Sequence, residues 1–352
     1  MSNFIITDLI YKHSLLTDKL VIIDCGAAGG SFQEWASRSD KIVIHGFDPD
    51  ENECKRLNAD ARAKGLQHYY YPFLIANDSQ NRNFYLTNQS CSNSLFEPNH
   101  HLISRYKQKF CDIEWISTLE TVGYKKTIQV NTTSLTTWAN KYSINDIDFI
   151  KLDVQGAELE ILKGAGNILN NVIGMNIEVW FVPVYKELPL FADIDMFVRS
   201  NQFDFFTFFI YTAGQFAGRM ASPVSFGKMN TSYAQRFAGQ LLTADALYFK
   251  DPLHNGGSLS TIKKLKLICL AEMNCQVEYA FELLYNLKHD FEEQSELQEE
   301  ITQIIDEAAS RYPKYVYVMK RYIGSHLLNY TNGVKFRLYR KIKPIVEKLR
   351  KL

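Results

Sequence analysis

The chain has 352 residues, of which 46% are hydrophobic and 22% charged, which suits a globular protein with one full α/β domain and an accessory region. Lysine plus arginine and aspartate plus glutamate each number 39, and this balance excludes the basic field typical of nucleic-acid-binding proteins. The N-terminus has no signal-peptide pattern and no apolar run reaches about 18 residues, so neither secretion nor a membrane-spanning helix is predicted.

Strand patterns alternate with helix patterns through roughly the first 250 residues, which predicts a mostly parallel sheet covered by helices on both faces. We expect strands at residues 20–25, 42–47, 68–73, 82–87, 127–133, 147–153, 173–181, 203–210 and 244–250. We expect helices near residues 31–38, 51–64, 134–143, 157–169 and 192–201. The strand pair within 68–87, interrupted by the polar residues 77–81, is interpreted as an inserted hairpin.

The first predicted strand ends in a loop of small residues. Residues 21–30 read VIIDCGAAGG, in which β-branched residues lead to Asp24 and then to Gly26, Ala27, Ala28, Gly29 and Gly30. A strand, a glycine turn and a helix capped by Ser31 form the nucleotide-binding entry of a doubly wound fold. The dinucleotide pattern G-x-G-x-x-G needs glycine at 26, 28 and 31, and only Gly26 fits. The loop therefore favours a nucleoside ligand without phosphates.

The second predicted strand ends at an acid, Asp48, which lies 22 residues after Gly26. In doubly wound folds an acid about 20 residues past the glycine turn accepts hydrogen bonds from ribose hydroxyls. Asp48 is followed by Pro49, so the alternative interpretation is a turn that caps the next helix. The strand context and the spacing favour the ribose-binding role.

The most informative stretch is DFIKLDVQGAELEILKGA at residues 148–165. An apolar run ends at Asp153 in the pattern of a buried parallel strand, Gly156 breaks the pattern, and a helix follows. A carboxylate at the carboxyl end of such a strand points into the crevice where open α/β sheets bind ligands, although Asp153 is also placed to cap the helix. Glu158 falls in the first helical turn, where the helix dipole favours an acid with or without a catalytic role.

A further acid, Glu178, lies inside the apolar strand NIEVWF. A buried carboxylate without a partner is costly there, so Glu178 is a candidate catalytic acid or base. The aromatic residues Trp180 and Tyr185 are candidates for stacking on an acceptor, or belong to the core. His100 and His101 are candidates for a general base, or form a solvated pair in a loop.

These stretches together resemble the FkbM-type S-adenosylmethionine-dependent methyltransferases. Members of that family carry a strand that ends in an acid and a GA-rich turn, then a strand that ends in F-[ED]-P, matched here by Phe47, Asp48 and Pro49. Their block I-D-V-E-G-A-E-x-x-V-L-K-G-A is matched between Asp153 and Ala165, with Gln155 where the family usually has glutamate. Partial matches occur in CSNSL and in IEVWFVPVYKELPLF, so the resemblance covers roughly residues 15–250.

The resemblance implies a fold, a cofactor and a reaction. The fold is α/β, a Rossmann-like class I methyltransferase sheet, mostly parallel with the last strand antiparallel, and an α-helical C-terminal extension follows it. The cofactor is S-adenosylmethionine, and the reaction is in-line methyl transfer to a hydroxyl of a sugar in a cell-surface glycan or natural product. The alternatives are a carboxylate or nitrogen acceptor, or a degenerate methyltransferase fold that binds without turnover. The glycine spacing is wrong for a dehydrogenase.

The resemblance also implies the site residues. The implied cofactor-binding residues are Asp24, Gly26, Ala28, Gly30, Asp48, Asn77, Asp78 and Asp153. The implied catalytic residues are Asp153, Glu178 and Glu158. Asn77 and Asp78 would meet the adenine amino group or form a plain Asx turn, and Asp24 would touch the methionine end of the cofactor or only hold the loop.

A domain boundary is predicted in the turn-rich segment 252–258, which divides a methyltransferase domain (1–252) from a helical C-terminal region (253–352). Residues 282–307 carry nine acids and one lysine, whereas residues 311–352 carry twelve lysines and arginines and one glutamate. The two runs can pair with each other as helices. The basic amphipathic stretch 335–352 can instead lie on an anionic membrane surface.

Other features bear on partners and compartment. The six cysteines show neither a C-x-x-C pair nor zinc spacing, so we expect reduced thiols and no required metal. We also expect a cytoplasmic location, with any membrane contact peripheral. Residues 212–235 form a long glycine-containing loop, which in a compact domain is commonly a lid. The sequence does not indicate an oligomeric state.

Overall fold

The computed structural model describes residues 4–30, 33–110, 114–210, 215–221, 239–254, 259–291 and 295–312. The chain forms two compact units, residues 1–287 and 288–352. The described helix of the second unit is α11 (Glu296–Arg311), which Ser295 caps by accepting a hydrogen bond from the backbone of Gln298. The predicted division into a methyltransferase domain (1–252) and a helical C-terminal region (253–352) stays a prediction.

The strands of the first unit form three sheets. The strands are β1 (Leu20–Cys25), β2 (Ile42–Phe47), β3 (His68–Tyr71), β4 (Leu74–Ala76), β5 (Asn81–Thr87), β6 (Tyr106–Phe110), β7 (Glu114–Ser117), β8 (Tyr124–Ser134), β9 (Phe149–Leu152), β10 (Gly174–Trp180), β11 (Asp204–Phe209), β12 (Phe216–Arg219), β13 (Gln240–Leu241) and β14 (Thr243–Phe249). The helices of this unit are α1 (Ile5–Lys12), η1 (Gln33–Lys41), α2 (Glu51–Ala63), η2 (Ser90–Ser92), α3 (His100–Ile103), α4 (Thr118–Val122), α5 (Leu135–Tyr142), α6 (Glu158–Ala165), η3 (Gly166–Asn170), α7 (Phe191–Ser200), α9 (Thr261–Met273) and α10 (Val277–His289).

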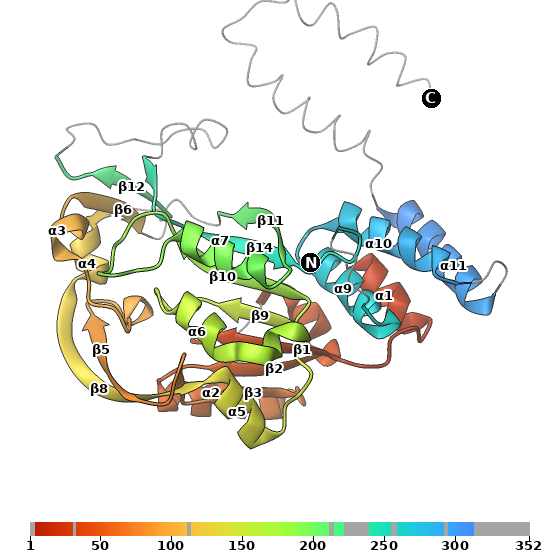
Figure 1. Ribbon diagram of the computed structural model, residues 1–352, viewed down its shortest axis with the longest axis horizontal. Helices are drawn as coiled ribbons and strands as arrows, with labels where there is room; N and C mark the ends of the chain where they lie inside the picture. Colours follow the sequence, from red (N-terminus) through yellow and green to blue (C-terminus); the bar gives the residue numbers. More distant parts are fainter. Residues whose placement is uncertain are drawn as a thin grey trace, which may run out of the picture. The chain divides into compact units, whose positions relative to one another are not determined.

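The central sheet has seven strands in the order β11-β14-β10-β9-β1-β2-β3 (Figure 1). Every neighbouring pair from β10 to β3 is parallel, and β14 is antiparallel to both β10 and β11. This is the predicted class I methyltransferase arrangement, mostly parallel with the last strand antiparallel, and it is confirmed. The chain leaves β1 toward β2 and later returns to its other side as β9, so the order reverses between β1 and β9. Ligands of open α/β sheets bind at the carboxyl ends of the strands at such a reversal.

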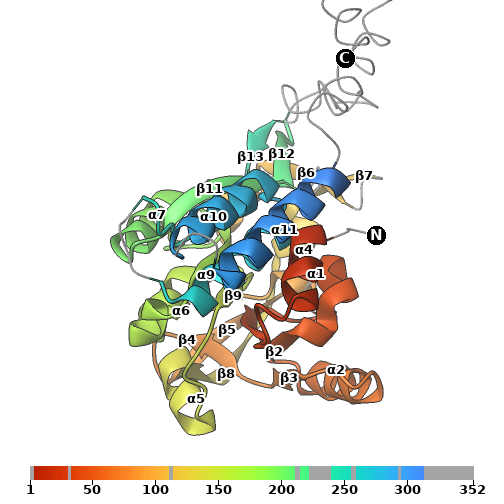
Figure 2. The ribbon, with the colours of Figure 1, turned by 90° about the vertical axis from the view of Figure 1, so that its right-hand side faces the viewer.

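Helices cover both faces of this sheet. Figure 2 shows α5, α6 and α7 on one side of it and α1 and α2 on the other. The parallel strands carry apolar side chains on both faces because both are covered, so β1 and β9 are almost continuously buried. The central apolar cluster joins strand residues such as Ile150 and Ile177 to helix residues such as Trp138 and Ile161.

The predicted hairpin within 68–87 is wrong. β3 pairs parallel with β2 at the edge of the central sheet, whereas β5 pairs antiparallel with β8 in a separate three-stranded sheet, β4-β8-β5. The partner of β5 lies about 40 residues further along the chain, where local turn patterns cannot reveal it. The helix predicted over 157–169 divides into α6 and η3 at Gly166, whose φ of 51° is left-handed.

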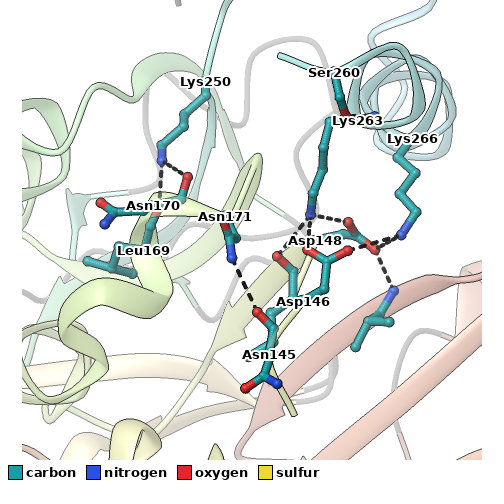
Figure 3. A network of polar contacts seen from close by, with 12 residues as sticks. Asn145, Asp146, Asp148, Leu169, Asn170, Asn171, Lys250, Ser260, Lys263 and Lys266 are labelled. Atoms are coloured by element: carbon teal, nitrogen blue, oxygen red, sulfur yellow. Dashed lines mark hydrogen bonds and ion pairs between the residues drawn. The ribbon is translucent and has the colours of Figure 1, made fainter. Parts of the chain in front are cut away.

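The amino end of β9 is fixed by a buried carboxylate, Asp148 (Figure 3). Its Oδ2 accepts hydrogen bonds from the backbone N–H of Val21 (2.8 Å) and from Lys266 Nζ (2.8 Å), and its Oδ1 lies 2.6 Å from Lys263 Nζ. Asp146 lies 2.7 Å from Lys263 Nζ as well. Because both lysines belong to α9, this cluster ties the helix that follows the sheet to the two strands at its centre.

Helix α9 is also held to the N-terminal helix. The carboxylate of Glu272 accepts hydrogen bonds from the backbone N–H groups of Ile6 and Thr7, both at 2.7 Å, and so caps the first turn of α1. Figure 1 shows the two helices side by side. Helix α9 is therefore part of the compact unit that contains the sheet.

A small four-stranded sheet, β13-β12-β6-β7, completes the first unit. The loop predicted as a lid over 212–235 lies mostly outside the described residues, and its described part contributes β12 to this sheet. The basic stretch 335–352 also lies outside the described residues. In the part of the chain that the structure describes, no helix is both long and apolar enough to cross a bilayer.

Candidate functional site

A cavity of about 500 Å³ opens at the carboxyl ends of β1, β2 and β9, where the strand order reverses. Its floor comes from the loops that follow these strands, and its remaining walls come from the segment 73–75 and from the β5/β8 sheet. The lining residues are Cys25, Gly26, Ala28, Phe47, Asp48, Pro49, Asp50, Glu53, Phe73, Leu74, Ile75, Phe84, Leu86, Ser90, Cys91, Asn93, Leu95, Ile128, Val130, Asp153, Val154, Gln155 and Ala157. A volume of this size is typical of small-molecule and cofactor sites.

The glycine loop after β1 passes very close to the end of β9. Gly26 has a φ of 88°, and a Cβ on it would stand 2.0 Å from the carbonyl oxygen of Asp153. The backbone N–H groups of Gly26 and Ala27 both donate to the carbonyl of Phe47 at 3.0 Å, which ties the loop to β2 as well. Glycine is required at 26 because any side chain would push the two strand ends apart.

The rest of the loop is open. A Cβ on Gly29 would meet nothing within 4 Å, and the backbone N–H of Gly29 donates to Glu53 Oε1 at 2.9 Å. Gly26 and Ala28 line the cavity, as the sequence predicts for cofactor-binding residues, whereas Gly30 does not and closes the turn by donating to the carbonyl of Ala27. Gly29 and Gly30 instead line a second cavity, of about 390 Å³.

Asp48 lies at the carboxyl end of β2 and lines the cavity. Its Oδ1 accepts a hydrogen bond from the backbone N–H of Asp50 at 2.8 Å. Burial raises the pKa of the carboxyl above its usual value, while the N–H of Asp50 opposes that shift. The Asp48 turn and the cap of α2 are separate, because Asp50 is the residue that accepts from Asn52 and Glu53 at the helix N-terminus. Asp48 is therefore left to face the cavity.

Asp24 is buried and does not line the cavity. Its carboxylate lies 3.4 Å from Lys151 Nζ on the neighbouring strand β9, and the same ammonium lies 3.6 Å from Asp153 Oδ2. Burial alone would lower the pKa of Lys151, but the carboxylates of Asp24, Asp153 and Asp245 raise it overall. Lys151 therefore stays charged between two acids of the predicted site.

Asp153 follows β9 and lines the cavity with its side chain 41% exposed. Its backbone N–H donates to the carbonyl of Cys25 at 3.0 Å, so the acid is anchored directly beside the glycine loop. Gln155 Nε2 lies 3.3 Å from Asp153 Oδ1. The structure thus brings Asp153, Gly26, Ala28 and Asp48 together around one cavity.

Glu158 has a different place. It is fully buried, and its Oε1 accepts hydrogen bonds from the backbone N–H groups of Val154 (3.0 Å) and Gly156 (3.2 Å). Burial raises the pKa of Glu158 to about 7, against the effect of those N–H groups. Glu158 is not among the cavity-lining residues, so its side chain supports the turn between β9 and α6.

Glu178 on β10 lies beside the cavity, behind Gln155. Its Oε2 accepts a hydrogen bond from Gln155 Nε2 at 2.9 Å, and its Oε1 lies 3.2 Å from Thr243 Oγ1. Burial and the carboxylates of Asp153, Glu158 and Asp245 raise the pKa of Glu178 well above its usual value. The strand acid singled out in the sequence therefore has the partners that a buried carboxyl needs.

Asn77 and Asp78 are not among the cavity-lining residues. They follow β4, which pairs with β8, and the Asp78 carbonyl accepts a hydrogen bond from Thr132 Oγ1 at 3.0 Å. The wall at this point is formed by Phe73, Leu74 and Ile75. The predicted contact with adenine stays a prediction that the cavity does not support.

The apolar wall opposite the glycine loop is absent from the sequence prediction. It is formed by Phe84 and Leu86 of β5 and by Ile128 and Val130 of β8. These pairs alternate with polar neighbours at a spacing of two, so they share one face of a strand, and that spacing is a signal that the sequence offers.

The other candidates are not among the residues that line the cavity. Trp180 and Tyr185 are buried at 5% and 0% exposure and pack edge to face in an apolar cluster, so neither is free to stack on an acceptor. His100 and His101 are exposed at the start of α3 and are not among the lining residues. Within the described ranges, no three His, Cys, Asp or Glu side chains are grouped as metal ligands would be.

Comparison with protein families gives one match. The family described as the methyltransferase FkbM domain matches residues 24–205, a range that begins at the end of β1 and includes the cavity floor. No curated protein sequence matches the chain.

Several solved structures are similar to the chain at low identity. Magnesium protoporphyrin IX methyltransferase (ChlM) from Synechocystis PCC 6803, with bound SAM, is 11% identical, with 70% of this chain and 76% of that chain covered and a TM-score of 0.31. TrmK of M. capricolum, in complex with S-adenosyl-homocysteine, is 9% identical, with 86% and 95% covered and a TM-score of 0.31. The O-MT of StiE (residues 961–1257) is 10% identical, with 76% and 80% covered and a TM-score of 0.32.

Proposed function

Because the chain belongs to the FkbM methyltransferase family, and is an S-adenosylmethionine-dependent methyltransferase, we propose that it methylates a hydroxyl group of a sugar. The sugar would belong to a cell-surface glycan or a natural product. The methyltransferase activity and the cofactor follow from the family, whereas the acceptor is the part that we propose.

The residues present fit S-adenosylmethionine. Gly26 lines the cavity, and the absence of a side chain there lets the loop approach the carbonyl of Asp153 closely. Asp48 would hold the ribose hydroxyls and Gly26 with Ala28 would lie against the methionine portion, while Phe73 offers flat apolar surface for the base. When bound, the cofactor supplies an electrophilic methyl group on a sulfonium.

One observation carries the choice of a hydroxyl acceptor: the exposed carboxylate of Asp153 lies in the cavity beside the glycine loop. A carboxylate there accepts a hydrogen bond from a hydroxyl, orients its oxygen and takes its proton as the oxygen becomes bonded to carbon. A positioned base of this kind typically contributes about 10²–10⁴-fold to the rate. Positioning of two bound reactants contributes roughly 7–11 kcal/mol.

The charges around the cavity support a neutral acceptor. The described lining contains four acids, Asp48, Asp50, Glu53 and Asp153, and no lysine, arginine or histidine. An acceptor carboxylate would be repelled by this set, whereas a hydroxyl or an amine would not. A carboxylate acceptor is thus the less favoured alternative, and an amine remains the rival that the experiment must test.

The experiment begins with calorimetric titration of the protein with S-adenosylmethionine, S-adenosylhomocysteine and NAD. We expect micromolar binding of the first two and none of NAD, and binding of NAD alone would refute the cofactor assignment. Acceptors would then be screened as matched pairs, a neutral sugar against its amino and uronic acid counterparts. Methylation of the amino sugar at nitrogen alone would contradict the hydroxyl proposal.

Asp153→Asn tests the base. The variant keeps the shape of the side chain, so we expect cofactor affinity within a few-fold of wild type and a turnover number lower by about 10²-fold or more. Full turnover by this variant would remove Asp153 from the mechanism. A chain that binds cofactor but methylates no member of any acceptor class would favour the degenerate binding module.

We also propose peripheral membrane contact through the basic segment 335–352, which would bring the enzyme to a lipid-linked acceptor. The proposal is supported by the composition of the segment alone, which lies outside the described residues. The full chain should sediment with anionic vesicles at low salt and not with neutral ones, and a chain ending at 334 should not sediment with either. Equal behaviour of the two chains would contradict it.

A further inference from the structure

Gln155 is held in an unusual backbone conformation at the edge of the cavity. Its φ is 59°, in the left-handed region that non-glycine residues rarely occupy, and Gly156 follows with a φ of 114°. Its carbonyl accepts a hydrogen bond from the buried hydroxyl of Ser94 at 2.6 Å, and Glu158 binds the backbone N–H on either side of it. Such strain persists where the surrounding structure fixes it, and it is often associated with function.

Both ends of the Gln155 amide have polar partners. Nε2 lies 2.9 Å from Glu178 Oε2 and 3.3 Å from Asp153 Oδ1, so each amide proton faces a carboxyl group. Oε1 lies 3.2 Å from the hydroxyl of Tyr185, whose single proton is shared with the carbonyl of Ser92 at 2.9 Å. The two carboxylates fix the orientation of the amide, because only its NH₂ end can donate to them.

The amide is placed where two acids would otherwise face each other. The two oxygens of Asp153 have different partners, since Oδ1 lies 3.3 Å from Gln155 Nε2 and Oδ2 lies 3.6 Å from Lys151 Nζ, which is also 3.4 Å from buried Asp24. Without the amide, the carboxylate would keep Lys151 as its one charged partner among these residues and would lose the donor that fixes Oδ1. The strained backbone of Gln155 thus presents the second donor that determines the orientation of Asp153.

We propose that Gln155 is a positioning residue for methyl transfer: its amide joins Asp153 to Glu178 and keeps the Asp153 carboxylate directed into the cavity. The inference rests on the proposed function for the role of Asp153, and it adds the residue that determines where that carboxylate points.

Several charged and titratable groups surround Asp153 and Glu178, and each of them can affect a measurement made across pH. They are Lys151 of β9, Asp24 of β1, Glu158 of α6, Asp245 of β14 and the Tyr185 hydroxyl. All of them remain in the variants described next, so differences between variants report the change at 155.

The first test compares Gln155→Glu with Gln155→Met across pH, by urea unfolding of the protein without ligand. Gln155→Glu keeps the shape but sets three carboxyl groups together, so the folded state must retain a proton that the unfolded state loses. Its folding equilibrium constant relative to wild type should therefore fall with rising pH, by about tenfold for each unit by which the shared pKa is raised. Gln155→Met adds no charge but removes both N–H donors to the carboxylates, so its loss of stability should rise with pH less steeply than that of Gln155→Glu.

Substitution of both flanking acids gives a matched rescue. In Gln155→Glu combined with Asp153→Asn and Glu178→Gln, a single carboxylate lies between two amides, which reverses the native order, and most of the pH dependence should disappear. A pH-independent loss in Gln155→Glu, equal to that of Gln155→Met, would overturn the proposal, since it would mean that the side chain of 155 only fills space.

The second test uses ligand affinity to measure how near the Asp153 carboxylate lies to the sulfur of the cofactor. S-adenosylmethionine carries a sulfonium charge that S-adenosylhomocysteine lacks, so the ratio of their Kd values measures how near a carboxylate lies to the sulfur. We expect the preference for the sulfonium to fall severalfold in Asp153→Asn and by a similar factor in Gln155→Met. A changed ratio in Asp153→Asn with an unchanged ratio in Gln155→Met would overturn the positioning role.

The two tests separate this inference from the function on which it rests. If wild type binds neither ligand, the proposed function fails, while the pH dependence of unfolding still decides whether Gln155 joins the two acids. If the ligands bind and the Asp153→Asn ratio equals that of wild type, Asp153 is not beside the methyl group and the positioning proposal fails with it.

Discussion

Asp48 shows how much of the site depends on one side chain at a strand end. The carboxylate lies in the cavity, already uses Oδ1 for the N–H of Asp50, and has a pKa raised by burial. Ribose hydroxyls would be bound by a charged acceptor, and hydrogen bonds to a charged group contribute about 1.5–3 kcal/mol each.

Asp48→Ala is therefore expected to raise the Kd for S-adenosylmethionine by about 100-fold or more. Asp48→Asn, which keeps an acceptor for the N–H of Asp50, should weaken binding less. Because the pKa is raised, protonation should weaken wild-type binding on the acid side at a higher pH than for an ordinary aspartate. Calorimetry at several pH values measures both effects, and micromolar binding by Asp48→Ala would refute the ribose assignment.

For Glu158 we predict an effect on stability and not on binding, because its carboxyl is buried under a turn and not in the cavity. Its pKa is about 7 in the folded protein, above the usual 4.5, so the folded state binds the proton more tightly. The stability that this group contributes is thus present at acid pH and is lost as pH rises through 7.

Glu158→Gln keeps the acceptor for the two backbone N–H groups but has no proton to lose. Relative to wild type it should gain stability with rising pH, by at most about 3 kcal/mol above pH 7. Urea unfolding at acid, neutral and alkaline pH checks the trend. A constant difference at all three would show that the carboxyl of Glu158 titrates normally.

At the scale of elements, the close approach of the glycine loop to β9 determines the shape of the site. Gly26 and Gly29 both have left-handed φ angles, 88° and 80°, but only at Gly26 would a Cβ meet another atom. Substitutions at Gly29 and Gly26 therefore distinguish the cost of a strained backbone from the cost of a steric clash.

Gly29→Ala should cost about 1 kcal/mol, the penalty of the left-handed conformation alone. Gly26→Ala must also displace the Asp153 carbonyl 2.0 Å away, so it should cost clearly more and raise the Kd for S-adenosylmethionine. Thermal unfolding and calorimetry of the two variants provide the comparison. Equal costs would mean that the loop can move away from β9 without loss.

The elements that local patterns specify were predictable, and those that depend on distant pairing were not. The strands β1, β2 and β9 and the turn residues after them follow from apolar runs that end at an acid and a glycine, which is why Asp48, Asp153 and Gly26 could be placed. β5 and β8 are far apart in the sequence, so their pairing could not be predicted, and neither could the apolar wall of the cavity that they form. The role of Gln155 depends on a hydrogen bond to Glu178 on another strand, which no local pattern contains.

At the scale of the whole first unit, the two ends of β9 have separate tasks. Asp153 at the carboxyl end faces the cavity, whereas Asp148 at the amino end binds the lysines of α9 (Figure 3). Stability and cofactor binding should therefore respond independently to substitutions at the two ends.

Among the described residues, Asp148→Ala leaves the buried ammonium of Lys266 with Asp146 alone as an acidic partner, at 3.9 Å, so we expect a loss of about 3–5 kcal/mol. The double variant Asp148→Asn with Lys266→Met removes both charges and should cost less than the sum of the single variants. In each variant that folds, the Kd for S-adenosylmethionine should equal that of wild type. A large change in Kd would show that the amino end of β9 is coupled to the cavity.

The cavity is assembled from two stretches of chain that can vary separately. The loops after β1, β2 and β9 line the part of the cavity where we propose that the cofactor binds, while an apolar wall comes from β5 and β8, which belong to a separate three-stranded sheet. Phe84, Leu86, Ile128 and Val130 belong to β5 and β8, so their replacement should leave the strands of the central sheet in place. Directed evolution for new acceptors can therefore begin with these four codons, as a compact library, without revisiting the cofactor half of the enzyme.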